Sequence, residues 1–133
     1  MTIRRLNPDT LHKNPAFTQV AVIEPGATLV HVGGQNAVDA DGNIVGHDIA
    51  SQTAQALKNV VMALAAAGAS LRDVFKMTVY IVPGQSVQEG FAAAQQFTDL
   101  STHPPTISVL VVAALGHPDF LIEIDATAAI QQE

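Results

Sequence analysis

The sequence contains no cysteine and few charged residues, and each shortage excludes a class of function. Without cysteine there is no disulfide, no thiolate nucleophile and no sulfur-ligated metal site, which agrees with a reducing compartment such as the cytoplasm. Charged residues make up 14% of the 133 residues, and the formal net charge is −6. A chain of this sign repels a phosphate backbone, so we expect no nucleic-acid partner.

Long apolar runs are missing as well. The longest alanine-rich run, residues 63–67, lies between Asn59 and Gly68 and is too short to cross a bilayer. No continuous apolar stretch follows residues 1–5, so the arrangement typical of a signal peptide is not found. We therefore expect a soluble, cytoplasmic protein without a membrane partner. With 48% apolar residues and no break in composition, residues 1–133 predict a single domain around one core.

Motifs that hold a metal or a phosphate group are also missing. The five histidines show no metal-ligand spacing, and the glycines do not form a phosphate loop. Residues 39–43 (DADGN) resemble the start of a calcium loop, but Ile44 and Val45 follow where further carboxylates are required. We interpret this segment as a tight surface turn, and we expect neither a metal nor a cofactor.

Among the features that are present, two apolar, β-branched runs come first. Residues 17–22 and 29–32 flank a turn signal at residues 24–26 (EPG), which predicts a hairpin of two antiparallel strands. Asp48 can then cap an amphipathic helix that ends at Gly68. The inward positions of this helix recur at steps of three and four residues: Thr53, Leu57, Val60 and Leu64.

The second half of the chain continues with a strand, a helix and two strands. Residues 74–82 alternate apolar and mixed side chains, which predicts a strand. A capping box at residues 86–89 opens a second helix. One side of that helix carries Phe91, Ala94, Phe97 and Leu100. Further strands are expected at residues 107–113 and 120–129.

The predicted order of elements is ββαβαββ, which indicates an α+β fold. Two helices that fall between strands of one mixed sheet pack most simply on a single face. The opposite face then lacks cover, although strands carry apolar residues on both sides, as at Leu29 and Val30. Subunit association would bury that face, so we expect an oligomer.

Several motifs resemble those of one known family. They are VGGQ at residues 32–35, QTAQALKN at 52–59, AGASLRDVFKMTVY at 67–80, AAL at 113–115 and LIEIDA at 121–126. In this order and spacing the chain resembles the Rid (reactive intermediate deaminase, YjgF-like, L-PSP endoribonuclease-like) family along nearly its whole length. The motifs agree with the element order predicted independently, and this agreement makes the resemblance specific.

The resemblance implies a chorismate-mutase-like fold, a homotrimer and a small-molecule cleft at each subunit boundary. In active family members this cleft hydrolyses enamines or imines to 2-keto acids and ammonia, without a metal or a cofactor. A positioned acid or base would assist protonation of the enamine carbon and attack of water on the imine. The central contact with the substrate is an arginine after a proline-containing turn, whose planar guanidinium pairs with the substrate carboxylate.

The chain departs from the family at this arginine. Alignment on residues 113–115 places the family arginine at Ile107, with Thr106 as the neighbouring choice if the register slips by one residue. Neither side chain can pair with a carboxylate. Loss of a hydrogen bond to a charged group removes about 1.5–3 kcal/mol, which lowers affinity by one or more orders of magnitude.

Other family positions in the cleft are matched or replaced by related residues. Glu123 matches the glutamate of the last strand, which the family uses to orient water or the substrate amine. It is therefore the candidate catalytic residue. The alternative is that Glu123 pairs with a residue across a subunit interface. Gly33 and Gly34 match positions where the backbone approaches the ligand, and a bulge is the alternative. Phe17 falls where active members often carry a tyrosine, and Gln95 falls near an asparagine of the second helix.

Two classes of function follow from this comparison. The first is a trimeric Rid-like protein that hydrolyses a small imine or enamine with Glu123 and water. The second is a non-catalytic binding or sensing trimer for an uncharged ligand, because Ile107 offers a carboxylate no partner. Under the first hypothesis, Arg4 or Arg5 is a candidate to replace the lost charge over a neighbouring cleft. RNA cleavage, a third activity attached to some relatives, is disfavoured by the net charge of −6.

Overall fold

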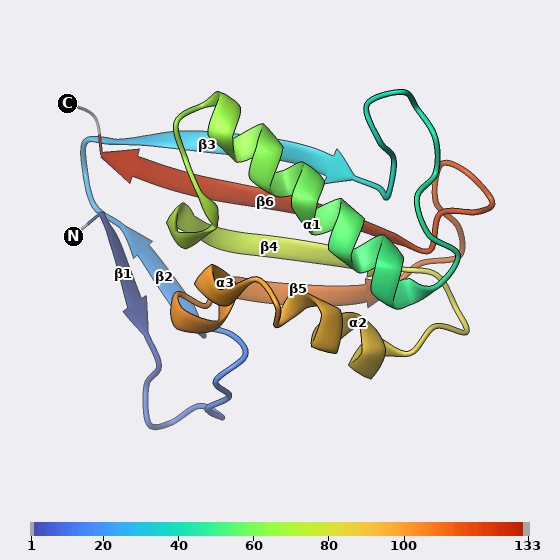
Figure 1. The fold of residues 1–133 in the computed structure, drawn as a ribbon. Coiled ribbons are helices and arrows are strands. Elements are labelled where there is room, and N and C mark those ends of the chain that lie inside the picture. The colour runs from blue at the N-terminus through green and yellow to red at the C-terminus, as the bar shows by residue number, and fades with distance from the viewer. Residues whose placement is uncertain (1, 132–133) are drawn as a thin grey trace.

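A mixed four-stranded sheet forms the centre of the fold (Figure 1). The computed structural model describes residues 2–131. The sheet has the order β3-β6-β4-β5, in which β4 and β5 run parallel and the other neighbours run antiparallel. Its strands are β3 (Ala27–Gln35), β4 (Val74–Ile81), β5 (Thr106–Val111) and β6 (Ile122–Gln131). The α+β class and the mixed sheet predicted from the sequence are confirmed.

Helices lie on one face of this sheet, as the sequence predicts (Figure 1). The long helix α1 (Ile49–Ala66) is followed later in the chain by α2 (Val87–Ala94) and α3 (Thr98–Thr102). The predicted second helix is therefore divided in two, because Phe97 has a non-helical backbone with φ −91° and ψ 89°. None of the helices within residues 2–131 is long and apolar enough to cross a membrane.

The ends of α1 have the local signals that the sequence predicts. Asp48 caps the first turn, and its Oδ1 accepts hydrogen bonds from the Ser51 amide at 2.7 Å and the Ser51 hydroxyl at 2.6 Å. These bonds stabilise the ionised carboxyl group and lower the pKa of Asp48. At the other end Gly68 has a φ of 76°, and the amide of Ala69 donates to the carbonyl of Leu64 at 2.9 Å. This is a Schellman ending, in which glycine avoids the strain of a left-handed backbone.

The predicted hairpin of residues 17–22 and 29–32 is wrong. Strand β2 (Val20–Ile23) pairs with β1 (Ile3–Leu6) in a separate two-stranded ribbon, and β3 pairs with β6 instead. Between β2 and β3 the chain passes through Gly26, whose φ is 89°, and changes direction without joining the two strands in one ladder. The sequence prediction also missed β1, because so short a segment has too few apolar positions to show a period.

Hydrogen bonds to the starts of β4 and β5 hold this ribbon in place. The Arg5 guanidinium donates to the carbonyls of Pro104 at 3.2 Å and of Arg72 and Val74 at 3.3 Å each. The Thr18 amide donates to the carbonyl of Pro105 at 2.9 Å, and the Thr18 hydroxyl donates to that of Pro104 at 2.6 Å. These non-local bonds satisfy backbone carbonyls at the end of the sheet, which accounts for the position of β2 away from β3.

The core lies between α1 and the sheet. All four inward positions predicted for α1 are buried, and they pack near the apolar side chains of β4 and β6. The opposite face has no helix over it within residues 2–131, and its exposed apolar residues include Leu29 on β3 and Leu110 on β5. The strands between these two, β6 and β4, present polar residues there, among them Tyr80 and Asp125. The open face is therefore apolar toward its edges and polar at its centre.

Candidate functional site

The predicted site residues lie on two opposite faces of the sheet. In the strand register Ile107 pairs with Met77, whereas Glu123 pairs with Tyr80. Side chains alternate between faces along a strand. Met77 is a buried core residue under the helices, and Tyr80 belongs to the open face. Ile107 therefore faces the helices, and Glu123 faces away from them.

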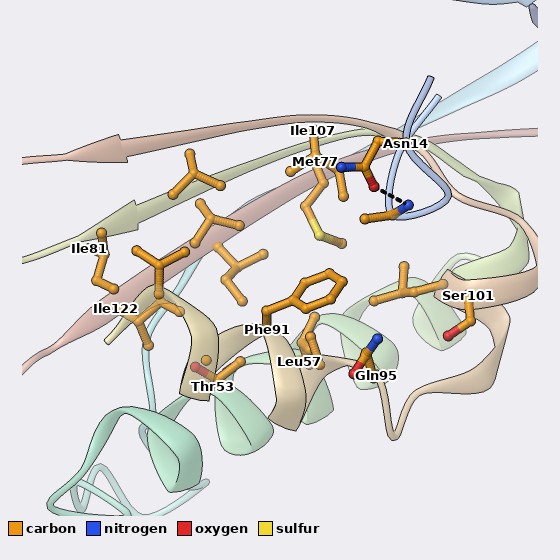
Figure 2. A pocket seen from close by; sticks show the side chains of 18 of the residues that line it. Asn14, Thr53, Leu57, Met77, Ile81, Phe91, Gln95, Ser101, Ile107 and Ile122 are labelled. Carbon is orange, nitrogen blue, oxygen red and sulfur yellow. Dashed lines mark hydrogen bonds between the residues drawn. The ribbon is translucent and has the colours of Figure 1, made fainter. Parts of the chain in front are cut away.

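The first cluster lines an apolar groove between α2 and the sheet (Figure 2). This groove has a volume of about 380 Å³, within the range of small-ligand pockets. Two predicted residues, Ile107 from β5 and Gln95 at the end of α2, line it. Its walls are mainly apolar, and no charged side chain lies among its lining residues. The groove therefore provides no cationic partner for a ligand carboxylate.

The polar residues of the groove gather at its two ends (Figure 2). Asn14, Gln95 and Ser101 are exposed and form the open end. The other end, near Ile81, is buried and contains Thr53. Between Met77 and Ile81 the strand advances four residues, or about 13 Å at 3.3 Å per residue. The groove is thus long enough for a small molecule with a polar group at each end.

Two other predicted residues lie beside the groove without lining it. The amide of Phe17 donates to the carbonyl of Asn14 at 3.4 Å, which places Phe17 in the loop whose residues 14–16 form part of the open end. The Thr106 hydroxyl donates to the carbonyl of Phe75 at 3.1 Å. Thr106 is therefore engaged with the backbone of β4.

The second cluster lies on the open face. Gly33 and Gly34 line a shallow polar hollow of about 360 Å³ together with His31, Lys76 and Tyr80. The ladder between β3 and β6 shifts register between Val32 and Gln35, so the two glycines form an irregularity of the strand. The register shift agrees with the bulge interpretation of this pair, whereas the approach of a ligand to the two glycines stays a prediction.

Gly34 also provides the space in which Glu123 lies. A Cβ atom added to Gly34 would lie 2.7 Å from Cδ and 2.9 Å from Cγ of Glu123, which no ordinary contact allows. The Glu123 carboxylate accepts a hydrogen bond from Nδ2 of Asn36 at 3.4 Å. Gly34 therefore packs closely against Glu123 within the chain.

We expect Gly34→Ala to lower the free energy of unfolding by about 1–3 kcal/mol, because the new methyl group must displace the Glu123 side chain. Gly33→Ala is the matched control, since an added Cβ there meets nothing within 4 Å. In a Glu123→Ala background the side chain that the new methyl group would displace is absent. Gly34→Ala should then lower the free energy of unfolding no more than Gly33→Ala does. Chemical denaturation of the four variants measures this coupling, and an equal cost of Gly34→Ala in both backgrounds would contradict it.

A tyrosine and aspartate pair in the hollow was not singled out from the sequence. The Tyr80 hydroxyl donates to Oδ2 of Asp125 at 3.0 Å. This bond, together with the negative charge of Asp125, raises the pKa of Tyr80. Strand alternation alone places Tyr80 on the face of Lys76 and Thr78, but the partner strand could not be read from local sequence.

Neither arginine near the N-terminus extends into the groove. Arg4 pairs with Glu24 at 2.9 Å on the surface, and Arg5 donates to three backbone carbonyls at the end of the sheet. Replacement of the family arginine by either would require these contacts to break. Within residues 2–131, no group of three potential ligands from histidine, aspartate or glutamate could hold a metal ion.

Comparisons with known proteins agree on one family. The family model described as Endoribonuclease L-PSP matches residues 10–130. A RutC family protein of Pyrococcus horikoshii is 35% identical over 101 residues, which cover 75% of this chain and 78% of that protein. The crystal structure of a Rid family protein of Yersinia pestis, YyfB, described as of unknown function, is 33% identical with a TM-score of 0.87, covering 98% of this chain and all of that one. Escherichia coli TdcF, solved with bound serine, is 28% identical with a TM-score of 0.70, covering 90% of this chain and 97% of that one.

Proposed function

Because the chain belongs to the Endoribonuclease L-PSP family, also known as the Rid or YjgF family, we propose that it is a homotrimeric small-metabolite protein whose groove binds an uncharged, mainly apolar ligand. One observation carries this proposal: Ile107, which the sequence comparison matches to the family arginine, lines a groove without a charged side chain. A carboxylate placed beside Ile107 would lose water without gaining a cationic partner, whereas a neutral ligand buries apolar surface at little electrostatic cost.

The separation of the two clusters supports the homotrimer. The groove with Ile107 and the hollow beside Glu123 open on opposite faces of one sheet, so a single ligand cannot touch both within one chain. A second copy that packs its open face against the groove would bring them together. Such packing would also cover exposed apolar residues at the sheet edges, Leu29 and Leu110 among them. Light scattering should give three chains per particle at micromolar concentration, and a stable monomer would contradict this arrangement.

Matched neutral and anionic ligands test the choice of ligand. Acetophenone and benzoate share a phenyl ring and differ in charge, and serine represents the ligand of TdcF. We expect the wild-type protein to bind acetophenone at least about 10-fold more tightly than benzoate or serine, because a carboxylate gives up hydrogen bonds to water worth about 1.5 kcal/mol or more each and finds no cationic partner in the groove. Ligand-observed NMR measures the three affinities. Equal or tighter binding of benzoate would contradict an uncharged site.

A second candidate function is hydrolysis of a neutral imine, and the position of Glu123 favours it. Its carboxylate lies against Gly34 and within hydrogen-bonding reach of Asn36, which limits its orientations at the edge of the hollow. A carboxylate held in this way can accept a proton from water as the water oxygen bonds to the imine carbon, and can return that proton to the imine nitrogen to give a carbinolamine. Transfer of the hydroxyl proton to the nitrogen through the same carboxylate then breaks the carbon–nitrogen bond, which yields the carbonyl compound and ammonia and leaves Glu123 ionised again. No metal or cofactor takes part in this sequence of steps.

Release of ammonia and carbonyl product distinguishes the two candidates. Freshly generated 2-aminoacrylate and a panel of bulkier, uncharged imines would be followed in buffer, with wild type and with Glu123→Ala. Acceleration by wild type that Glu123→Ala removes supports hydrolysis, and the preferred imine identifies the substrate class. No acceleration over buffer leaves binding alone as the function. RNA cleavage is not proposed, because a net charge of −6 opposes binding of a phosphate backbone.

A further inference from the structure

The buried end of the groove contains a hydroxyl group without a hydrogen-bond partner. Thr53 is 3% exposed, and its Oγ1 is the one buried side-chain nitrogen or oxygen atom within residues 2–131 that lacks a partner. Most buried polar groups in proteins are satisfied, since a hydroxyl that leaves water without a new partner destabilises the fold. An exception at a groove end calls for a specific explanation.

No neighbouring side chain is free to satisfy this hydroxyl. The adjacent Gln52 already uses its amide group on the backbone of Gly46, Asp119 and Leu121. Across the groove end, α2 presents Gly90, and a Cβ atom there would lie 3.4 Å from Oγ1 of Thr53. Apolar residues make up the rest of this end, including Ile81 and Ile122 (Figure 2). The Thr53 hydroxyl is therefore an isolated polar group in apolar surroundings.

We propose that Thr53 donates its hydroxyl hydrogen to a carbonyl oxygen of the ligand at the buried end of the groove. This inference rests on the proposed function and deepens it by naming the ligand class as neutral carbonyl compounds with an apolar body, such as ketones, aldehydes and amides. The body lies along Phe91 and Ile107, and its far end reaches the exposed polar residues of the open end (Figure 2). A single donor in apolar surroundings selects strongly for a ligand that carries the matching acceptor.

Acetophenone and ethylbenzene provide the test, because they have nearly the same shape and differ in the carbonyl oxygen. Their affinities would be measured by ligand-observed NMR for wild type, Thr53→Val and Thr53→Ser. Valine keeps the β-branched shape without the hydroxyl, and serine keeps the hydroxyl without the methyl group. Thr53→Val should lower the ratio of ketone to hydrocarbon affinity by roughly 10-fold, and Thr53→Ser should leave that ratio near the wild-type value.

Thermal unfolding of the ligand-free proteins provides an independent readout. Thr53→Val removes an unsatisfied buried hydroxyl, so its unfolding midpoint should lie at or above that of wild type, and ketone should raise the wild-type midpoint more than that of the variant. A merely structural role of the hydroxyl would instead lower the midpoint of Thr53→Val and weaken both ligands equally.

The possible failures are distinct. If both ligands bind wild type but Thr53→Val leaves their ratio unchanged, the role of Thr53 is wrong while the uncharged groove stands. If Thr53→Val weakens ketone and hydrocarbon to the same degree, the role of Thr53 is again wrong. If neither ligand binds wild type, whether because a second copy fills the groove or because the site is not used, both this inference and the proposed function are wrong.

Discussion

Ile107→Arg should raise the affinity for benzoate and serine by about 10- to 100-fold and reverse the preference of the groove for neutral ligands. The arginine would stand at the start of β5, on the face that lines the groove, where its guanidinium can pair with a ligand carboxylate in a bidentate manner. A hydrogen bond to a charged group contributes about 1.5–3 kcal/mol, which corresponds to this range of affinity. If the imine-hydrolysis candidate is correct, the same variant should also accelerate hydrolysis of 2-aminoacrylate.

Two control variants separate a positioned contact from a general effect of charge. Val109→Arg adds the same charge to another groove residue, two positions along the same strand. Ile107→Met keeps an uncharged side chain of similar size. We expect neither to gain carboxylate affinity beyond about 3-fold, since a partly solvated charge without fixed geometry contributes less than 1 kcal/mol. A gain in Val109→Arg equal to that in Ile107→Arg would show that the position of the family arginine has no special role here.

Gln52→Ala should produce the largest loss of stability, about 3 kcal/mol or more. The Gln52 side chain is 1% exposed, and its Nε2 donates to the carbonyls of Gly46 at 3.1 Å and Asp119 at 2.9 Å. Its Oε1 accepts from the amide of Leu121 at 2.8 Å. Truncation leaves these backbone groups without their partner and leaves a cavity, and each unsatisfied buried group costs about 1–3 kcal/mol. The two loops that Gln52 joins, before α1 and before β6, would lose their connection.

Gln55→Ala is the matched control for this prediction. Gln55 lies on the same helix, and its amide group donates to the side chain of Asn59 at 2.9 Å, one turn away. Helix propensity changes equally in both variants, and the loss of one such side-chain pair costs about 0.5 kcal/mol. Chemical denaturation measures both changes. If the two variants lose free energies of unfolding that differ by less than about 1 kcal/mol, the prediction is wrong. The buried hydrogen bonds of Gln52 would then stabilise the fold no more than hydrogen bonds to water do in the unfolded chain.

Local features of the fold were predictable because neighbours in sequence produce them. The period of α1 placed Thr53, Leu57, Val60 and Leu64 inward, and all four are buried. The cap at Asp48 and the ending at Gly68 depend on residues within one turn of the helix. The family resemblance, carried by short motifs in a fixed order, identified the family that the comparisons show.

Features that depend on strand pairing could not be predicted in this way. The turn at Gly26 is local and was recognised, but whether β2 pairs with β3 or with β1 depends on hydrogen bonds from Arg5 and Thr18 to residues about 70 to 100 positions away. The face on which a strand residue lies changes with a shift of one residue in register, because side chains alternate with a period of two. For this reason the alignment named Glu123 and Ile107 as members of one site, and only the register shows that they lie on opposite faces.

The amino-acid sequence by itself determined the class of fold, the amphipathic helix with its ends, and the family. Tertiary structure alone decided that Ile107 lines an apolar groove, that Gly34 makes room for Glu123, and that Thr53 is buried at the groove end without a partner. The physical reason is the range of the interactions: periodicity and capping act over a few residues, whereas burial, cavities and unsatisfied groups depend on which distant segments pack together.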